Sequence, residues 1–290
     1  MSLVIATAVA EGIVIGADSR TTNRNYSVGG QPRIGSEYEE KLFEVCGLAI
    51  GTSGCSNFGG QRIAEHIAEF AKSLQQKPTF DEVATGLAIH FQKLRAAHVA
   101  KVAAEPAPAD PKEAEGAQSL KEAALANSGI YFLVAGFDGD YPRVDRIFVT
   151  EPDPKLAPQG FARITAFKDG TGGVEFIGMT DVCERLIHGY SVTLLDGIPP
   201  DIDRKLKSTA TNIPFSSWKL QDAMNLVWTL FHVTMFMQRI SVSRPELGME
   251  HPNVGGEIEY ISVRKSGVKW EIRKDTSVRP TMPDPPDVDD

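Results

Sequence analysis

The serine at position 2 could give this chain an unusual reactive group. Removal of Met1 would leave Ser2 with a free α-amine and a hydroxyl on the same residue. A serine hydroxyl is a weak nucleophile at neutral pH and needs a base beside it. An α-amine titrates near ~7.7 to 8.0, so a usable fraction is neutral at pH 7 and can accept the hydroxyl proton. An N-terminal serine therefore combines nucleophile and base in one residue.

The residues after Ser2 predict a buried β-hairpin that would hold it rigidly. Residues 3–10 form an apolar run, Glu11-Gly12 is a two-residue turn signal, and residues 13–17 resume the apolar run. Asp18 follows as the first charged residue of the second strand. Ser2 would then lie at the fixed end of a core strand, which is an unusual place for the start of a chain.

Three stretches carry a resemblance to a known family. Residues 12–22 (GIVIGADSRTT), Lys41-Leu42-Phe43 and Gly51-Thr52-Ser53-Gly54 together resemble the N-terminal half of a proteasome β-type subunit. In that family of N-terminal-nucleophile (Ntn) hydrolases, a mature N-terminal Thr precedes a GADSR-like motif, a Lys and a glycine loop. The resemblance covers most of residues 2–274 and is nearer to bacterial and archaeal proteasome-like proteins, because no propeptide precedes Ser2.

The resemblance implies catalytic roles for four residues. Counting back from Asp18 over the hairpin places Ser2 at the nucleophile position. Lys41 is the candidate cation, which would lower the pKa of the α-amine and stabilise developing negative charge. Asp18 would supply the countercharge that a desolvated lysine needs. Gly54 would donate a backbone N–H to the oxyanion, a contribution typically worth ~3 kcal/mol.

Two further residues are assigned to substrate binding by the same resemblance. Thr22 matches the position whose main chain pairs with an extended substrate, and Thr52 matches the wall of the primary specificity pocket. Each assigned residue also has a plain structural interpretation. Asp18 could be an ordinary turn aspartate, Lys41 a solvated lysine at a strand end, and Thr52 a satisfied loop hydroxyl. Their joint placement favours the catalytic interpretation.

The chain departs from the family in three ways. Serine replaces the usual threonine, which keeps the chemistry but loses the methyl group that fixes the rotamer. Maturation would rely on methionine aminopeptidase, which favours a small second residue. The family's residues that support the amine have no clean match, and the candidates for that role are Thr180, Glu250, His251 and Asn253.

Composition bounds the class of protein. The chain has 290 residues, 42% of them hydrophobic, and a formal net charge of −8 with scattered basic residues, which argues against nucleic-acid binding. No stretch reaches the ~20 apolar residues of a membrane span, and nothing basic precedes residues 3–10 as in a secretory signal. Three cysteines without metal-ligand spacing favour a reducing, cytoplasmic setting, and the six histidines also lack such spacing, so neither metal nor cofactor is predicted.

The rest of the chain predicts strands and helices in alternation. Helices are expected over residues 61–74, from a Thr79 capping box to 101, over 180–188 with Gly189 as a stop, and over 218–240. The last of these is apolar nearly all round, which predicts burial inside the domain or against a neighbouring subunit. Residues 51–54 are expected to be a loop, and the glycine turn at 169–173 to close a hairpin.

We expect one α+β domain over residues 2–274, followed by a disordered tail over 275–290. Insertions are expected near residues 23–40, 103–127 and 191–216. The order of elements predicts two antiparallel sheets between helical layers, and the resemblance implies the four-layer αββα sandwich of Ntn hydrolases. It also implies a homo-oligomer.

The resulting hypothesis is a cytoplasmic peptidase that cleaves peptide bonds through an acyl-enzyme on Ser2. Peptides or proteins would be the substrates. A transpeptidase or ligase, or a hydrolase of small amides, would use the same nucleophile. A proteasome-like scaffold subunit without activity is the alternative from another class, and retention of Met1 would favour it.

Overall fold

The structure of this chain is a computed structural model. It describes residues 2–28, 31–105, 118, 121–122, 125, 128–155, 157–190, 198–208, 210–240 and 253–274, with the side chains of 22–34 and 203 outside that description. The expected insertion at 103–127 lies largely outside the described residues, and the expected tail lies wholly outside them.

The first sheet contains the hairpin that begins the chain. Its order is β12-β1-β2-β13-β14, and every neighbouring pair is antiparallel. The five strands are β1 (Leu3–Val9), β2 (Gly12–Asp18), β12 (Gly173–Gly178), β13 (Ile258–Arg264) and β14 (Gly267–Ile272). Every residue of β1 and β2 is buried, as their continuous apolar runs predict, so the predicted hairpin is confirmed as the centre of this sheet.

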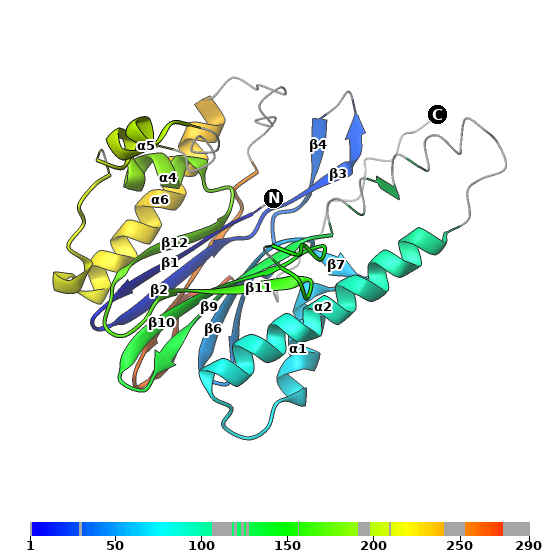
Figure 1. The fold of residues 1–290 in the computed structure, drawn as a ribbon, viewed down its shortest axis with the longest axis horizontal. Coiled ribbons are helices and arrows are strands. Elements are labelled where there is room, and N and C mark those ends of the chain that lie inside the picture. Colours follow the sequence, from blue (N-terminus) through cyan, green and yellow to red (C-terminus); the bar gives the residue numbers. More distant parts are fainter. Residues whose placement is uncertain are drawn as a thin grey trace, which may run out of the picture.

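The second sheet has the order β11-β10-β9-β6-β5 and is also antiparallel. Its strands are β5 (Leu42–Val45), β6 (Leu48–Gly54), β9 (Ile130–Asp138), β10 (Tyr141–Val149) and β11 (Phe161–Phe167). Two separate ribbons complete the strands, namely β3 (Thr21–Val28) with β4 (Gln31–Ser36) and β7 (Asn57–Phe58) with β8 (Gln61–Arg62). The β3–β4 ribbon projects from the end of the sheets at which β1 begins (Figure 1).

Helices accompany both sheets. They are α1 (Ile63–Ser73), α2 (Phe80–Ala104), α4 (Asp181–His188), α5 (Pro200–Lys207), the 3-10 turn η2 (Phe215–Ser217) and α6 (Leu220–Ile240). Figure 1 shows α4, α5 and α6 beside the first sheet, and α1 and α2 on the other side of the molecule beside the second. The predicted α+β class is therefore confirmed.

Three apolar clusters hold these elements together. One lies between α1, α2 and the second sheet, one joins α4 and α6 to the first sheet, and the third joins the two sheets. Gly51 permits the close approach of the sheets in the third cluster, because a Cβ there would lie 2.5 Å from Val4 Cγ1. The absence of a side chain at Gly51 therefore lets the two sheets pack closely at this point.

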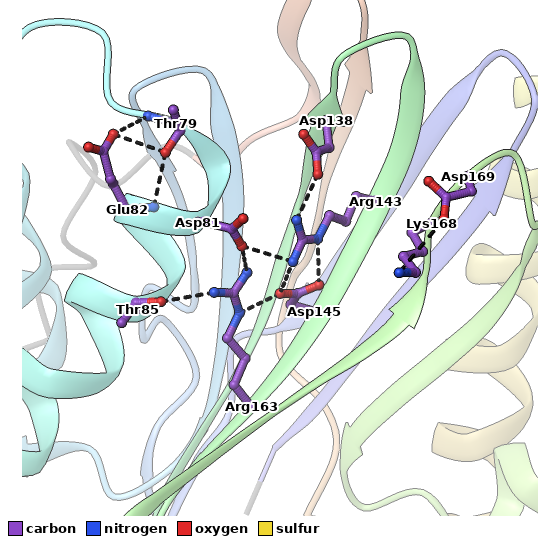
Figure 2. A network of polar contacts seen from close by, with 10 residues as sticks. All are labelled: Thr79, Asp81, Glu82, Thr85, Asp138, Arg143, Asp145, Arg163, Lys168 and Asp169. Carbon is purple, nitrogen blue, oxygen red and sulfur yellow. Dashed lines mark hydrogen bonds and ion pairs between the residues drawn. The ribbon is translucent and has the colours of Figure 1, made fainter.

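A charged network fastens the start of α2 to the second sheet (Figure 2). Asp145 of β10 is fully buried and accepts hydrogen bonds from Arg143 Nε at 3.0 Å and Arg163 Nε at 2.5 Å. Both guanidinium groups also reach Asp81 in the first turn of α2, and Arg163 Nη1 donates to Thr85 Oγ1 at 2.9 Å. No local pattern in the sequence predicts this network.

Local capping signals predicted the helix ends well. Thr79 and Glu82 form the expected capping box of α2, with both reciprocal bonds present. Gly189 adopts the left-handed conformation after α4, as expected of a glycine stop. These predictions are confirmed.

Two local expectations are wrong. Residues 51–54 are not a loop, because they continue β6 and pair with β9. The turn at 169–173 does not close a hairpin, because β11 and β12 lie in different sheets. The expected insertion at 191–216 stays a prediction; the range contains α5, and its residues 191–197 lie outside the described part.

Helix α6 buries one face within this chain. Val227 and Phe231 of that face are fully buried against the first sheet, whereas Trp228, Phe236 and Ile240 are more than half exposed. Burial of the second face against a neighbouring subunit, the other expectation for this helix, stays a prediction.

Candidate active site

Ser2 lies at the start of β1 and is 5% exposed. Its carbonyl oxygen accepts a hydrogen bond from Met179 N at 2.8 Å, and Leu3 opposes Gly178 in the register of β1 and β12. Gly178 has φ +95°, and a Cβ there would lie 1.8 Å from the Ser2 carbonyl oxygen. Only glycine fits at this position, so β12 fixes the backbone of Ser2 from one side.

Asp18 joins three segments of the site. Its Oδ1 accepts hydrogen bonds from Leu3 N and from Lys41 Nζ, each at 2.9 Å. Its Oδ2 accepts one from Gly255 N at 3.0 Å. Asp18 ends β2, and the β1–β2 register places it beside the first residues of β1. The predicted pairing of Asp18 with Lys41 is therefore present, next to the backbone of Ser2.

Lys41 is a buried cation, with its side chain 4% exposed. Its Nζ also donates to the Arg20 carbonyl oxygen at 2.5 Å. Burial lowers the pKa of Lys41, and the attraction of the Asp18 carboxylate opposes that effect only in part. Buried ionisable groups with a shifted pKa and a specific charged partner are frequent at functional sites.

A clamp of backbone and side-chain bonds closes around Asp18. Ser19 N and Arg20 N donate to the Gly255 carbonyl oxygen at 3.2 and 2.9 Å. The Arg20 guanidinium lies against Gly255 and forms an ion pair with Glu37 at 2.9 Å. A Cβ at Gly255 would lie 2.5 Å from Arg20 Cζ. The paired glycines at 255–256 are the sequence signal for this contact.

The end of β6 lies across from Ser2. Ser53 Oγ would be 2.8 Å from a Cβ at Gly178, the residue that contacts the Ser2 carbonyl. Gly54 ends the strand with φ +109°, where a Cβ would lie 2.5 Å from the Gly129 carbonyl oxygen. The use of its N–H as an oxyanion donor stays a prediction. Ser53 was not among the predicted site residues, although it neighbours two of them.

Thr52 is bound to Lys41 through the backbone. Its N donates to the Lys41 carbonyl oxygen at 2.9 Å. The residue is 5% exposed, and its Oγ1 has no hydrogen-bond partner within the described part of the chain. Thr22 lies on β3 opposite Ile34, and its side chain lies outside the described residues. Both substrate-binding roles stay predictions.

The candidates for support of the amine differ in their surroundings. Thr180 precedes α4, and its hydroxyl donates to Glu184 Oε1 at 2.6 Å, so it is engaged within the helix. Asn253 is 1% exposed, and among the described residues its Oδ1 has no partner. Glu250 and His251 lie outside the described residues.

Metal-ligating and membrane-spanning features were also sought. Over the described ranges, no group of three or more His, Cys, Asp or Glu side chains is placed to hold a metal ion. In the same ranges, no helix combines the length and hydropathy needed to cross a bilayer.

The two antiparallel sheets and their helices form a proteasome-like α+β fold. Among solved structures, the fold is similar to that of a Gly-1 mutant of Anbu from Hyphomicrobium sp. strain MC1. The TM-score is 0.51 and the sequence identity 15%, over 94% of this chain and 86% of the Anbu chain. Anbu is a bacterial protein of proteasome-like Ntn-hydrolase type.

Comparison at the sequence level gave no counterpart. No protein-family model matches the chain, and no curated protein matches it. At 15% identity, the likeness to Anbu shows the fold alone, so the site residues rest on their own geometry.

Proposed function

We propose that this protein is an Ntn hydrolase with a four-layer αββα sandwich, and that it cleaves peptide bonds through an acyl-enzyme on Ser2. The observation that carries the proposal is the buried Asp18 carboxylate. It binds Leu3 N and Lys41 Nζ through one oxygen and so ties the residue after Ser2 to a desolvated lysine. A fold of this kind has no evident structural need for a charged lysine at that place.

The proposed chemistry follows from the groups at this end of the sheets. Ser2 Oγ attacks the carbonyl carbon while the α-amine takes the hydroxyl proton. The N–H of Gly54 would hold the developing oxyanion. Collapse of the intermediate breaks the C–N bond, and the protonated α-amine passes its proton to the leaving nitrogen. Water then hydrolyses the ester by the same route and restores Ser2.

The lysine would act on this sequence through its charge. A cation near the α-amine lowers the pKa of that amine, so a larger fraction is neutral and able to accept a proton at pH 7. Asp18 keeps the ammonium oriented and compensates its burial. An extended peptide would pair with the backbone of Thr22 on one side and of Gly54 on the other.

Intact-mass spectrometry tests the proposal before any substrate is known. The natively expressed protein is measured before and after treatment with a peptide epoxyketone, and the adduct is mapped by fragmentation. Loss of Met1 and a single adduct on Ser2 are expected. A protein that retains Met1 lacks the free amine, so that result would rule out the mechanism and favour a scaffold subunit.

Two controls sharpen this measurement. Ser2→Ala keeps the removal of Met1 and should abolish the adduct, whereas Ser53→Ala removes a neighbouring hydroxyl and should leave it. With peptide substrates and an added amine, products that contain a new peptide bond would indicate a transpeptidase instead. Turnover of small amides but not of peptides would indicate an amidase.

We also propose that copies of the chain associate, in a cytoplasmic setting. The exposed face of α6, which carries Trp228, Phe236 and Ile240, supports this expectation because so much apolar surface on one helix is uncommon on a monomer. Analytical ultracentrifugation should show an oligomer that dissociates when Phe236 is changed to Glu. A monomeric wild type would rule out the association.

A further inference from the structure

A second buried lysine lies behind the candidate site. Lys274 follows β14, and its side chain is 2% exposed. Its Nζ donates to the Glu39 carbonyl oxygen at 2.5 Å and lies 3.4 Å from Glu259 Oε2. The Glu259 side chain is 3% exposed. The proposed mechanism uses neither member of this ion pair.

The position of the pair connects it to Lys41. Glu39, whose carbonyl oxygen Lys274 holds, stands two residues before Lys41 in the chain. The N–H of Glu39 donates to the Ser19 carbonyl oxygen at 2.8 Å, directly after Asp18. The segment that carries Lys41 is therefore held through Glu39 by two groups, namely the Ser19 carbonyl oxygen next to Asp18 and the Lys274 ammonium group.

The burial of this pair calls for an explanation. Removal of two charges from water is expensive, and apolar residues of similar volume often serve the fold as well or better. Burial raises the pKa of Glu259, and the positive charge of Lys274 opposes that rise. The Lys274–Glu259 pair is buried close to the Lys41–Asp18 pair, so it is a candidate for an electrostatic role at the site.

Each charged group around Lys41 either raises or lowers the pKa of Lys41. Asp18 and Glu39 favour the charged form of Lys41, whereas Lys274 disfavours it. Burial raises the pKa of the Glu39 carboxyl despite Arg62 and the two lysines nearby. The charges that act on Glu259 are those of Lys274 and, less strongly, Glu40.

We propose that Lys274 is a positioning residue for Lys41. Its ammonium group holds the backbone of the segment that carries Lys41 and, through its charge, makes Lys41 release a proton more readily. The catalytic consequence rests on the proposed function, because it assumes that Lys41 acts on Ser2. The effect of Lys274 on the protonation of Lys41 does not depend on that assumption.

Titration of Lys41 tests the proposal directly. Lysine labelled with ¹³C at Cε is followed by NMR across alkaline pH, and the Lys41 signal is assigned by its loss in Lys41→Arg. The double variant Lys274→Met with Glu259→Gln removes both charges and leaves no unpaired buried carboxylate. In this variant the midpoint of Lys41 should move to higher pH.

A matched control removes an exposed pair instead. Lys265 and Asp140 form an ion pair whose side chains are 67% and 74% exposed. The variant Lys265→Met with Asp140→Asn should leave the Lys41 midpoint unchanged. Lys274→Arg keeps the charge and should restore most of the wild-type midpoint. An unmoved midpoint in a folded double variant would overturn the proposal.

A second variant tests the same proposal if the double variant does not fold. Glu259→Gln alone keeps Lys274 and removes its countercharge, so the Lys41 midpoint should move to lower pH, opposite to the double variant. A shift in the same direction for both variants would overturn the proposal, because a general loosening of the site would give that result.

The rate of adduct formation on Ser2 separates this inference from the proposed function. In the double variant the rate at pH 7 should fall by about tenfold to 100-fold, because the segment that carries Lys41 loses the hydrogen bond from Lys274 to Glu39. The loss should be smaller at higher pH, where Lys41 of the variant keeps the charge that the wild type gives up. A wild type that forms no adduct would refute the proposed function, and the titration would still decide the role of Lys274. A uniform loss of rate with an unmoved Lys41 midpoint would overturn the positioning role.

Discussion

Two buried aspartates, Asp18 and Asp145, anchor ion pairs of contrasting kinds. Asp18 binds one lysine and two backbone N–H groups, whereas Asp145 binds the guanidinium groups of Arg143 and Arg163 (Figure 2). A lysine can lose its proton when it is desolvated, but an arginine stays charged at every accessible pH. On the proposed function, the partner of each aspartate therefore distinguishes the candidate active site from a network that holds structure.

The electrostatics of the two regions differ in the same sense. Burial dominates at Lys41 and lowers its pKa. Burial also disfavours the charged form of Arg143, but hydrogen bonds to Asp145 and Asp138 outweigh it and raise the pKa of Arg143. The network also lies toward the other end of β9, because Asp138 is the last residue of that strand and Ile130, opposite Gly54, is the first.

The largest expected effect is on the rate of the reaction at Ser2. Lys41→Met should slow adduct formation by about 10²- to 10³-fold, the range typical of a lost electrostatic group at a reacting centre. Asp145→Asn should leave that rate within about twofold of wild type once both proteins are shown to be folded. Equal losses in the two variants would break the distinction between the regions. The measurement is the rate of mass increase with a peptide epoxyketone.

The second effect is on the stability of the fold. Asp145→Asn leaves two guanidinium groups with their main countercharge removed, so the free energy of unfolding should fall by about 3 to 5 kcal/mol. Urea denaturation followed by tryptophan fluorescence measures the change. Asp169→Asn is the matched control, because its pair with Lys168 is exposed and 3.7 Å long, and no measurable change is expected.

A smaller loss of stability is expected at the helix that the network holds. Thr79→Ala removes the side-chain cap of α2 and should lower the free energy of unfolding by about 1 kcal/mol. The same urea measurement applies, and adduct formation should be unaffected. A loss as large as that of Asp145→Asn would mean that the cap, more than the carboxylate, fixes α2.

The smallest effect is a response to acid on the α2 side of the molecule. Burial, and then the neighbouring His66, lower the pKa of His90. A base with a lowered pKa stabilises the fold above its unfolded value of about 6.5, and that contribution is lost as the pH falls through the folded value. The urea concentration at the midpoint of unfolding should therefore decrease once the pH is lowered below about 6.5.

Replacement of the histidine tests that assignment. His90 lies 5.6 Å from the Phe70 ring between centroids, so His90→Phe keeps aromatic packing and removes the titration. The acid-induced fall of the urea midpoint should shrink in this variant. It should persist in His232→Gln, which changes an exposed histidine stacked on Trp228. A persistent fall in His90→Phe would assign the acid response to other groups.

Features that depend on neighbouring residues could be predicted from the sequence. The hairpin of β1 and β2, the capping box of Thr79 and the stop at Gly189 follow from signals within a few residues of one another. The pairing of Asp18 with Lys41 was accessible only through the family resemblance, because 23 residues separate them.

Features set by distant contacts could not be predicted. Glycines at 51–54 were interpreted as a loop, but Gly51 serves the approach of two sheets and Gly54 ends a strand. The assignment of β11 and β12 to different sheets depends on partners far along the chain. Arg163 and Asp81, which are 82 residues apart, gave no local signal of their contact.

The hydrogen bond from Leu3 N to Asp18 has a consequence for motion. That amide belongs to the third residue of the chain, yet it is buried and bound to a carboxylate at the centre of the clamp. Its hydrogen exchange should require opening of the first sheet and should be as slow as that of the core strands. The backbone of Ser2 therefore has little freedom to move, so on the proposed function the substrate would have to adjust to Ser2.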